Sequence, residues 1–269
     1  MFLRFTSFAN DSAGRYWQSY RFRVSNPYRQ PRFTLQQLPH HVDTTISSAS
    51  LSEYRRIIME DAIRSRLSAA PWATALINNP DWTPTSTSSR LPKPSGEDSF
   101  FAETLGTDRT IRACLTLRPT KATDDELAYR EIKTIVDLGD GLNGYPQIAH
   151  GGFVATLLDE VCGVLIVVNM EARDRRLREL GQSSNHRTVY YFTACTLRCS
   201  SRHGSTKLIN LDLNISYRGP VPTPGPNLCT AKIERQDGRK LYIRATVEDG
   251  AGRVYTVGEA MFLETKPKL

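Results

Sequence analysis

The residues best suited to chemistry lie in one apolar run, AHGGFVATLLDEVCGVLIVVN, at positions 149–169. It opens with His150, Gly151 and Gly152. If a helix begins here, the N–H groups of its first turn have no partner inside the helix and lie at the positive end of its dipole. Because glycine has no Cβ, a carbonyl oxygen can approach these donors and be polarised by them. A tight turn into the helix is the other explanation for the two glycines.

Two acidic residues, Asp159 and Glu160, interrupt the same run at its centre. Adjacent helical residues point about 100° apart, so at most one of them faces a given site. A carboxylate on a buried helix needs a partner or a task. Asp159 could act as a general base on water, or it could attack a carbonyl carbon itself. It could also form a structural ion pair, for example with Arg218 or Arg244.

The spacing of these residues predicts how they could act together. Gly151 and Asp159 are eight residues apart, which is about 12 Å along a helix axis. One small carbonyl group cannot contact both of them. If both serve one reaction, Asp159 must come from a second subunit whose helix runs antiparallel across a two-fold axis. We therefore expect a homodimer, or a dimer of dimers, with equivalent sites at the interface.

The segments around this run predict the fold class. Apolar and polar residues alternate, as in half-buried strands, over residues 109–117, 129–138, 208–222, 227–236, 240–249 and 254–264. Two strands, a long helix and several further strands indicate an α+β fold, with an antiparallel sheet wrapped around a long central helix. Two carboxylates at the middle of the helix would be costly in a bilayer. We therefore expect the helix to be buried in protein, without stable membrane insertion.

The chain divides into segments of different composition. Residues 1–48 are predicted to be a basic leader, and 49–91 a helical extension and linker in which Pro71 breaks or restarts the helix. The main domain is expected at 92–266. The first 42 residues contain six arginines and a single acidic residue, which is typical of a mitochondrial transit peptide; a disordered leader on a cytoplasmic protein is the alternative. Residues 171–206 fit poorly, and we expect a charged extension of the helix followed by an atypical insertion.

Other function classes find less support in the sequence. The net charge of +7 lies largely in the leader, and no nucleic-acid-binding signature accompanies it, so we expect no nucleic-acid partner. Neither a Walker loop nor a G-x-S-x-G motif occurs. Five cysteines without framework spacing predict free thiols. Cys195, Cys199 and His203, with His186 upstream, match no common zinc module, so we expect no metal and no cofactor.

Three segments together resemble the hotdog-fold acyl-CoA thioesterases. They are HGGFVATLLDE, LNISYRGPVPTPG and GRKLYIRATVEDGAGRVYTVGEAMFLE. The resemblance covers roughly residues 92–264 and is to the PaaI-type branch and the mitochondrial members of the thioesterase superfamily, in a form common in fungi. It rests on His-Gly-Gly with an aspartate nine residues after the histidine, followed by an N-x-x-Y-x-x-P-x-P strand. It implies a hotdog fold and the hydrolysis of acyl-CoA without metal or redox cofactor.

The resemblance also implies roles for particular residues. Asp159 corresponds to the catalytic carboxylate, which acts as general base or nucleophile. The N–H of Gly151 polarises the thioester carbonyl, and His150 holds the loop that carries it. Asn210 aligns with the position where many members use a hydroxyl to orient the water. An amide at that position can still hold a water by hydrogen bonds.

Substrate contacts follow from the same resemblance. Asn143 or Gly144 falls near an asparagine that lies beside the carbonyl in many members, although Asn143 precedes His150 by seven residues rather than six. Basic residues near the mouth of the site meet the CoA phosphates in the family; a solvated hairpin turn is the alternative for the Gly-Arg-Lys sequence here. The predicted substrate-binding set is Gly152, Asn143, Phe153, Arg218, Arg239 and Lys240.

Three other functions remain open from the sequence. One is a hotdog-fold hydratase or dehydratase acting on acyl thioesters, with His150 paired to an acid across the site. A second is a non-catalytic module that binds acyl-CoA or a protein partner and keeps Asp159 in a salt bridge. A third is the release of an acyl chain in a biosynthetic cluster.

Overall fold

The computed structural model describes residues 9–10, 16–17, 63–181 and 212–263. The chain divides into two compact units, Met1–Leu51 and Ser52–Leu269. In the first unit, the described residues form the antiparallel pair β1 (Ala9–Asn10) and β2 (Tyr16–Trp17). All remaining described elements belong to the second unit.

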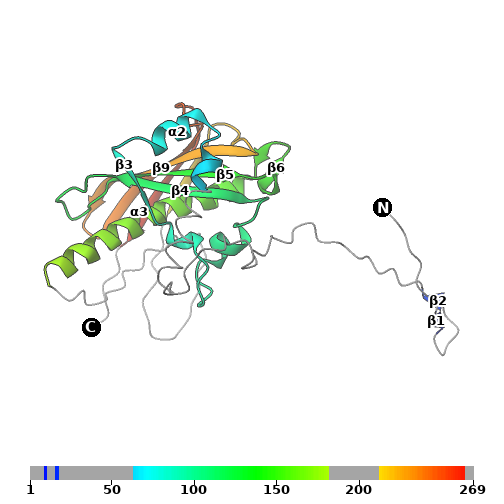
Figure 1. Cartoon of the computed structure of the whole chain (residues 1–269), viewed down its shortest axis with the longest axis horizontal. Coiled ribbons are helices and arrows are strands. Elements are labelled where there is room, and N and C mark those ends of the chain that lie inside the picture. Colours follow the sequence, from blue (N-terminus) through cyan, green and yellow to red (C-terminus); the bar gives the residue numbers. More distant parts are fainter. Residues whose placement is uncertain (1–8, 11–15, 18–62, 182–211, 264–269) are drawn as a thin grey trace, which may run out of the picture. The chain divides into compact units, whose positions relative to one another are not determined.

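A seven-stranded antiparallel sheet dominates the second unit, with the strand order β3-β4-β5-β9-β10-β11-β8. Its strands are β3 (Trp82–Thr85), β4 (Ile111–Pro119), β5 (Glu131–Leu138), β8 (Leu213–Tyr217), β9 (Gly225–Asp237), β10 (Lys240–Glu248) and β11 (Val254–Leu263). The sheet curves around one long helix, α3 (Gly151–Glu179), as Figure 1 shows. The predicted α+β fold, with an antiparallel sheet around a central helix, is confirmed.

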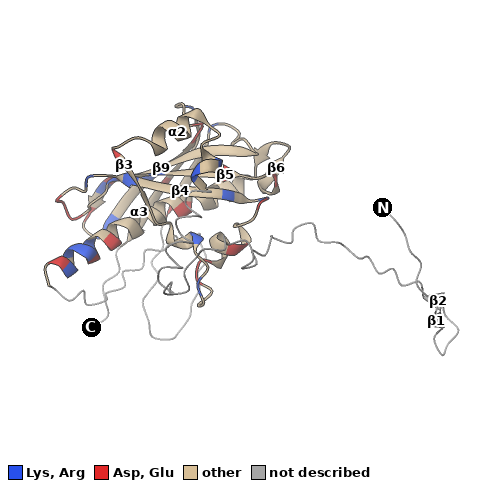
Figure 2. Ribbon diagram, viewed as in Figure 1, with Lys and Arg blue, Asp and Glu red and all other residues tan. Residues whose placement is uncertain are grey.

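Helix α3 forms where its sequence is apolar on nearly every side. Ten of its 29 residues are buried, and it contacts β5, β9, β10 and β11. Most of its charged residues lie in the last third, where every residue from 171 to 179 is exposed or half-buried, and they are coloured red and blue in Figure 2. The expected charged extension beyond residue 171 is therefore confirmed. Among the described residues, α3 is the one helix long and apolar enough to cross a membrane, yet over half of its most apolar stretch is buried against the sheet and its neighbours.

Helices also cover the opposite face of the sheet. Residues 63–67 are helical, and Pro71 starts a new helix, α2 (Pro71–Ile77), as expected for a proline at the first helical position. Two adjacent residues of β5 point to opposite faces of the sheet. Val136 packs among the buried apolar residues around α3, and Ile135 packs among those around α2. Side chains alternate along a strand, so the unit has three layers: α3, the sheet and the N-terminal helices (Figure 1).

The segment before the main domain differs from the predicted linker. The sheet begins at Trp82, ahead of the boundary expected at residue 92, because β3 pairs with the edge of β4. Threonines favour a strand, and Pro84 is tolerated because β3 is an edge strand. The chain then continues as a strap, residues 88–105, which contains η2 (Ser88–Arg90) and η3 (Phe100–Thr104). Side-chain contacts of the strap, rather than regular periodicity, attach it to the domain.

Candidate active site

The first turn of α3 is organised by His150, which caps the helix. Its backbone is extended, with φ −63° and ψ 133°, and its Nδ1 accepts a hydrogen bond from the Gly152 N–H at 3.1 Å. Its carbonyl oxygen accepts from the Val154 N–H at 3.1 Å. Among the described residues, no acceptor meets the Gly151 N–H. This N–H therefore remains available to a ligand at the positive end of the helix.

A loop with two short strands supports this helix start. It consists of η4 (Asp140–Leu142), β6 (Asn143–Tyr145) and β7 (Ile148–Ala149). The His150 N–H donates to the Leu142 carbonyl at 2.8 Å. A Cβ on Gly144 would come within 3.0 Å of the His150 Cα, so only glycine allows this close approach without a shift. Asn143 accepts a hydrogen bond at Oδ1 from the Thr223 hydroxyl, which leaves its amide nitrogen as a donor.

The structure adds Tyr217, a residue that was not among the predicted site residues. Its hydroxyl donates to the Gly151 carbonyl oxygen at 2.8 Å. Its ring lies 3.6 Å from the point that a Cβ on Gly151 would occupy. Tyr217 is the tyrosine of the N-x-x-Y-x-x-P-x-P pattern, so the pattern contained a signal, but sequence spacing alone did not link it to Gly151.

Asp159 lies two turns further along α3 and is half-buried. Burial, and secondly the negative charge of Glu160, raise the pKa of its carboxyl group to about 7. An ion pair would lower this pKa instead. Of the two suggested ion-pair partners, Arg244 pairs with Glu259 across β10 and β11 at 3.2 Å. These observations favour a carboxyl group that exchanges a proton near neutral pH.

Glu160 has different surroundings from its neighbour. It accepts a hydrogen bond from the Ser89 hydroxyl of the strap. Burial is the main reason that its pKa is raised, and the charges of Arg90 and Lys93 act in the opposite direction. Arg90 in turn donates to backbone carbonyls of the strap and of β4. Glu160 therefore holds the strap to α3.

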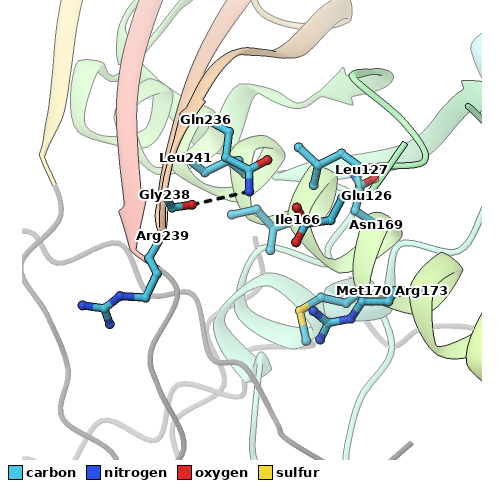
Figure 3. A pocket seen from close by; sticks show the side chains of 10 residues that line it. All are labelled: Glu126, Leu127, Ile166, Asn169, Met170, Arg173, Gln236, Gly238, Arg239 and Leu241. Atoms are coloured by element: carbon cyan, nitrogen blue, oxygen red, sulfur yellow. Dashed lines mark hydrogen bonds between the residues drawn. The ribbon is translucent and has the colours of Figure 1, made fainter. Parts of the chain in front are cut away.

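The basic hairpin predicted to meet CoA phosphates lies elsewhere on the same chain. Arg239 stands at the turn between β9 and β10 and lines a pocket with Arg173, Ile166 and Met170 of α3 (Figure 3). Met170 is 19 residues beyond Gly151, or about 28 Å along the helix. Within one chain, the structure thus separates the hairpin from the helix start. In Figure 3 the Arg239 side chain extends away from the other lining residues.

The other predicted site residues have varied positions. Lys240 is the first residue of β10 and is exposed. Arg218 directly follows Tyr217, is exposed, and donates its backbone N–H to the Tyr255 carbonyl at 2.8 Å. Phe153 is half-buried against the core around α3. Asn210 lies outside the described residues, as do the cysteines and histidines considered for zinc and most of the expected insertion at 171–206.

No family model matches the chain. Verlamelin biosynthesis protein B of Lecanicillium sp is 37% identical over 177 residues, which are 63% of this chain and 73% of that protein. Acyl-coenzyme A thioesterase THEM4 of Mus musculus is 23% identical over 128 residues, 47% of this chain. The match spans 40% of the mouse enzyme, so the chain corresponds to less than half of that protein's length.

Two solved structures are also similar to parts of this chain. Zebra fish thioesterase superfamily member 2 is 13% identical, and the match covers 66% of this chain and 93% of that chain with a TM-score of 0.40. A thioesterase protein of Streptococcus pneumoniae TIGR4, solved with coenzyme A, is also 13% identical. That match covers 52% of this chain and 81% of the other, with a TM-score of 0.35.

Proposed function

The chain belongs to the hotdog-fold thioesterase superfamily, as its sequence predicted, and on this basis we propose that it hydrolyses the thioester of an acyl-CoA to a free acid and CoA. One observation carries the proposal. A helix start whose Gly151 N–H faces no described acceptor is followed, eight residues later, by a carboxyl group with a pKa of about 7. The first can stabilise an oxyanion, and the second can take a proton from water at neutral pH.

In the proposed reaction, the thioester carbonyl oxygen accepts a hydrogen bond from Gly151, and the Asn143 amide is a second candidate donor. Asp159 removes a proton from a water molecule as the water oxygen attacks the carbonyl carbon. The negative charge passes to the carbonyl oxygen, where the Gly151 N–H stabilises it. When the C–S bond breaks, the proton held by Asp159 passes to the departing sulfur, which yields the acid and CoA.

We propose that the active enzyme is a homodimer. Gly151 and Asp159 are separated by about 12 Å along an unbroken helix, so one carbonyl group requires Asp159 of the partner subunit. Strand β8 supports this arrangement, because it is an edge of the sheet with one side unpaired among the described residues. In an antiparallel dimer, Asp159 of the partner subunit would lie beside Gly151. The partner's α3 would then run about 17 Å further from that aspartate to residue 170, the part of the helix that lies near the basic hairpin. We therefore assign Arg239 and Lys240 of the partner subunit, together with Arg218, to the CoA phosphates.

The test is turnover of a panel of acyl-CoA chain lengths by wild-type protein and three variants. Asp159→Asn should lower kcat by about 10²–10⁴ because it removes the base, and the dimer should persist. Gly151→Pro removes the N–H at a first helical position that tolerates proline, after an extended His150 that suits it. Gly151→Ala keeps the N–H and should lose much less activity.

The same assay separates the other functions. Hydration of an enoyl-CoA without thiol release would identify a hydratase. Tight acyl-CoA binding without any turnover would identify a binding module. Wild-type rates in Asp159→Asn would rule out the proposed mechanism, whichever substrate is turned over.

A second candidate function concerns the source of the acyl chain. The relative that is 37% identical bears the name of a biosynthesis protein. We propose, as the alternative, that the chain releases an acyl group during biosynthesis, so that its thioester is held on a carrier protein rather than on CoA. Comparing kcat/KM for one acyl group on CoA and on a phosphopantetheinylated carrier protein distinguishes the two substrates.

We also propose that the protein acts in mitochondria, on the basis of the arginine-rich, acid-poor beginning of the sequence. A fluorescent fusion of the full chain should locate to mitochondria, and deletion of residues 1–48 should return it to the cytoplasm. Cytoplasmic fluorescence of the full chain would contradict this assignment.

A further inference from the structure

We propose that Tyr217 is a positioning residue that fixes the direction of the Gly151 N–H; this inference rests on the hydrolase function proposed above. The two residues are 66 positions apart in the sequence, yet the Tyr217 hydroxyl donates to the Gly151 carbonyl oxygen at 2.8 Å. The ring also lies against the Gly151 α-carbon, with 3.6 Å to the position of a Cβ. Tyr217 therefore contacts the residue proposed to hold the oxyanion, and it does so through the backbone.

Gly151 needs such a contact because glycine has the freest backbone of all residues. Two peptide planes meet at its α-carbon. The plane before it is held by the hydrogen bond from the Val154 N–H to the His150 carbonyl. The plane after it is held at both ends, since its carbonyl accepts from Tyr217 and its N–H, that of Gly152, donates to His150 Nδ1. With both planes fixed, the Gly151 N–H keeps one direction before any substrate binds.

Tyr217 is itself held firmly enough to serve this purpose. It ends β8 opposite Thr256 of β11, and the next two backbone N–H groups donate to the Tyr255 carbonyl at 2.8 and 2.9 Å. Downstream, the Val221 carbonyl accepts from the Ala149 N–H at 3.0 Å, just before His150. Residues 217–221 thus contact the chain on both sides of His150. Val221 contacts Ala149 before it, and the Tyr217 hydroxyl contacts Gly151, the first residue of the helix, after it.

The hydroxyl can be removed without disturbing the core, because Tyr217 is 56% exposed. Tyr217→Phe keeps the ring against Gly151 and deletes only the hydrogen bond. Tyr242→Phe is the matched control: it also deletes one hydroxyl from a strand tyrosine, and it retains the ring on which Arg235 lies. Tyr242 lies on β10, two residues after Lys240, and it is not among the residues proposed to contact the substrate or the helix start.

The experiment measures kcat and KM for acyl-CoA and records amide spectra of protein labelled with ¹⁵N-glycine. Removing a direct oxyanion donor costs about 10²–10³ in kcat, so loss of a residue that only orients the donor should cost less, about tenfold. We expect Tyr217→Phe to lower kcat by this factor with KM nearly unchanged, and to shift the Gly151 and Gly152 amide signals. Tyr242→Phe should change neither.

Two results would overturn the inference: unmoved Gly151 and Gly152 signals in Tyr217→Phe, or a raised KM with wild-type kcat, which would mean that the hydroxyl contacts substrate. Wild-type protein without activity on any acyl thioester would contradict the proposed function instead. The glycine spectra do not depend on turnover, so they decide in that case whether Tyr217 holds the Gly151 backbone.

Discussion

Asp159 is a carboxyl group whose surroundings match the task proposed for it. Burial in the helix is the main cause of its raised pKa, and the adjacent Glu160 adds to it. A general base works best when its pKa lies near the working pH. A value of about 7 keeps the carboxylate partly populated at neutral pH and strong enough to take a proton from water.

The first prediction concerns the pH dependence of hydrolysis. Below pH 7 Asp159 is mostly protonated and cannot act as a base, so kcat/KM should rise as the pH passes through about 7. Glu160→Gln removes a negative charge that disfavours ionisation of Asp159. The pKa of Asp159 should then fall, and the rise of kcat/KM should move to lower pH. Rates over pH 5–9 on one acyl-CoA measure this shift.

Glu171→Gln is the control for this experiment, because it removes a carboxylate from the same helix about 18 Å from Asp159 along the axis. Its profile should coincide with that of the wild type. A profile that rises at the same pH in Glu160→Gln and in wild-type protein would show that Asp159 is not the group that titrates.

The residues of the helix start could be predicted from the sequence, but the contacts that hold them could not. His150, Gly151 and Asp159 lie within ten positions, so helix geometry alone relates them. Tyr217 and Ser89 contact the helix from 66 and 71 residues away. Such pairs depend on how the strands are ordered, and no periodicity within a short segment carries that information.

At the scale of elements, the hairpin turns allow a stability test. Gly238 and Gly250 both have positive φ, +55° and +75°, which disfavours any residue with a Cβ. An added Cβ on Gly238 meets open space, whereas one on Gly250 would overlap the Trp72 ring of α2. Gly238→Ala should cost about 1–2 kcal/mol of unfolding free energy from the backbone alone. Gly250→Ala should cost about 1–3 kcal/mol more, from overpacking.

Chemical denaturation of the two variants measures this difference, and Trp72→Ala provides the internal control. In a Trp72→Ala background, the two alanine substitutions should have similar costs, because the ring that causes the overlap is gone. If Gly250→Ala remains the more costly change without Trp72, then α2 does not cover this turn in solution.

Elements in which apolar and polar residues alternate regularly were predicted well, and elements without such a regular pattern were not. Strands β4, β5, β9, β10 and β11 alternate apolar and polar residues, and all five lie where alternation placed them. The start of the strap, up to residue 91, was interpreted as part of a linker because Pro, Ser and Thr dominate the sequence there. Its attachment depends on single polar contacts, such as Ser89 with Glu160 and Arg90 with backbone carbonyls. These contacts leave no repeating pattern in the sequence.

At the scale of the whole molecule, the packing limits where a second chain can bind. The N-terminal helices cover the outer face of the sheet, and their cluster includes Leu67, Ala73 and Ile77. The edge at β4 is covered by β3. Among the described elements, β3 and β8 are the two edges of the sheet; β3 contains Pro84, which has no N–H to donate, whereas β8 lies beside the helix start and can pair with another copy. This location is the one that the shared-site mechanism requires.

The last prediction tests whether one reaction uses residues of two chains. Asp159→Asn and Gly151→Pro each inactivate both sites of a symmetric dimer. In a hybrid of the two variant chains, one site has the intact Gly151 of the first chain and the intact Asp159 of the second. The other site has neither. The purified hybrid, selected by a different affinity tag on each chain, should thus recover about half of the wild-type kcat per dimer.

A second hybrid controls for chain exchange and for tag effects. When both substitutions are placed in one chain and paired with a wild-type chain, each site contains one defect, so this hybrid should be inactive although it carries the same two substitutions. The opposite result, with the first hybrid inactive and the second half-active, would mean that Gly151 and Asp159 of the same chain work together. A helix that separates them by about 12 Å makes that outcome incompatible with a single thioester carbonyl.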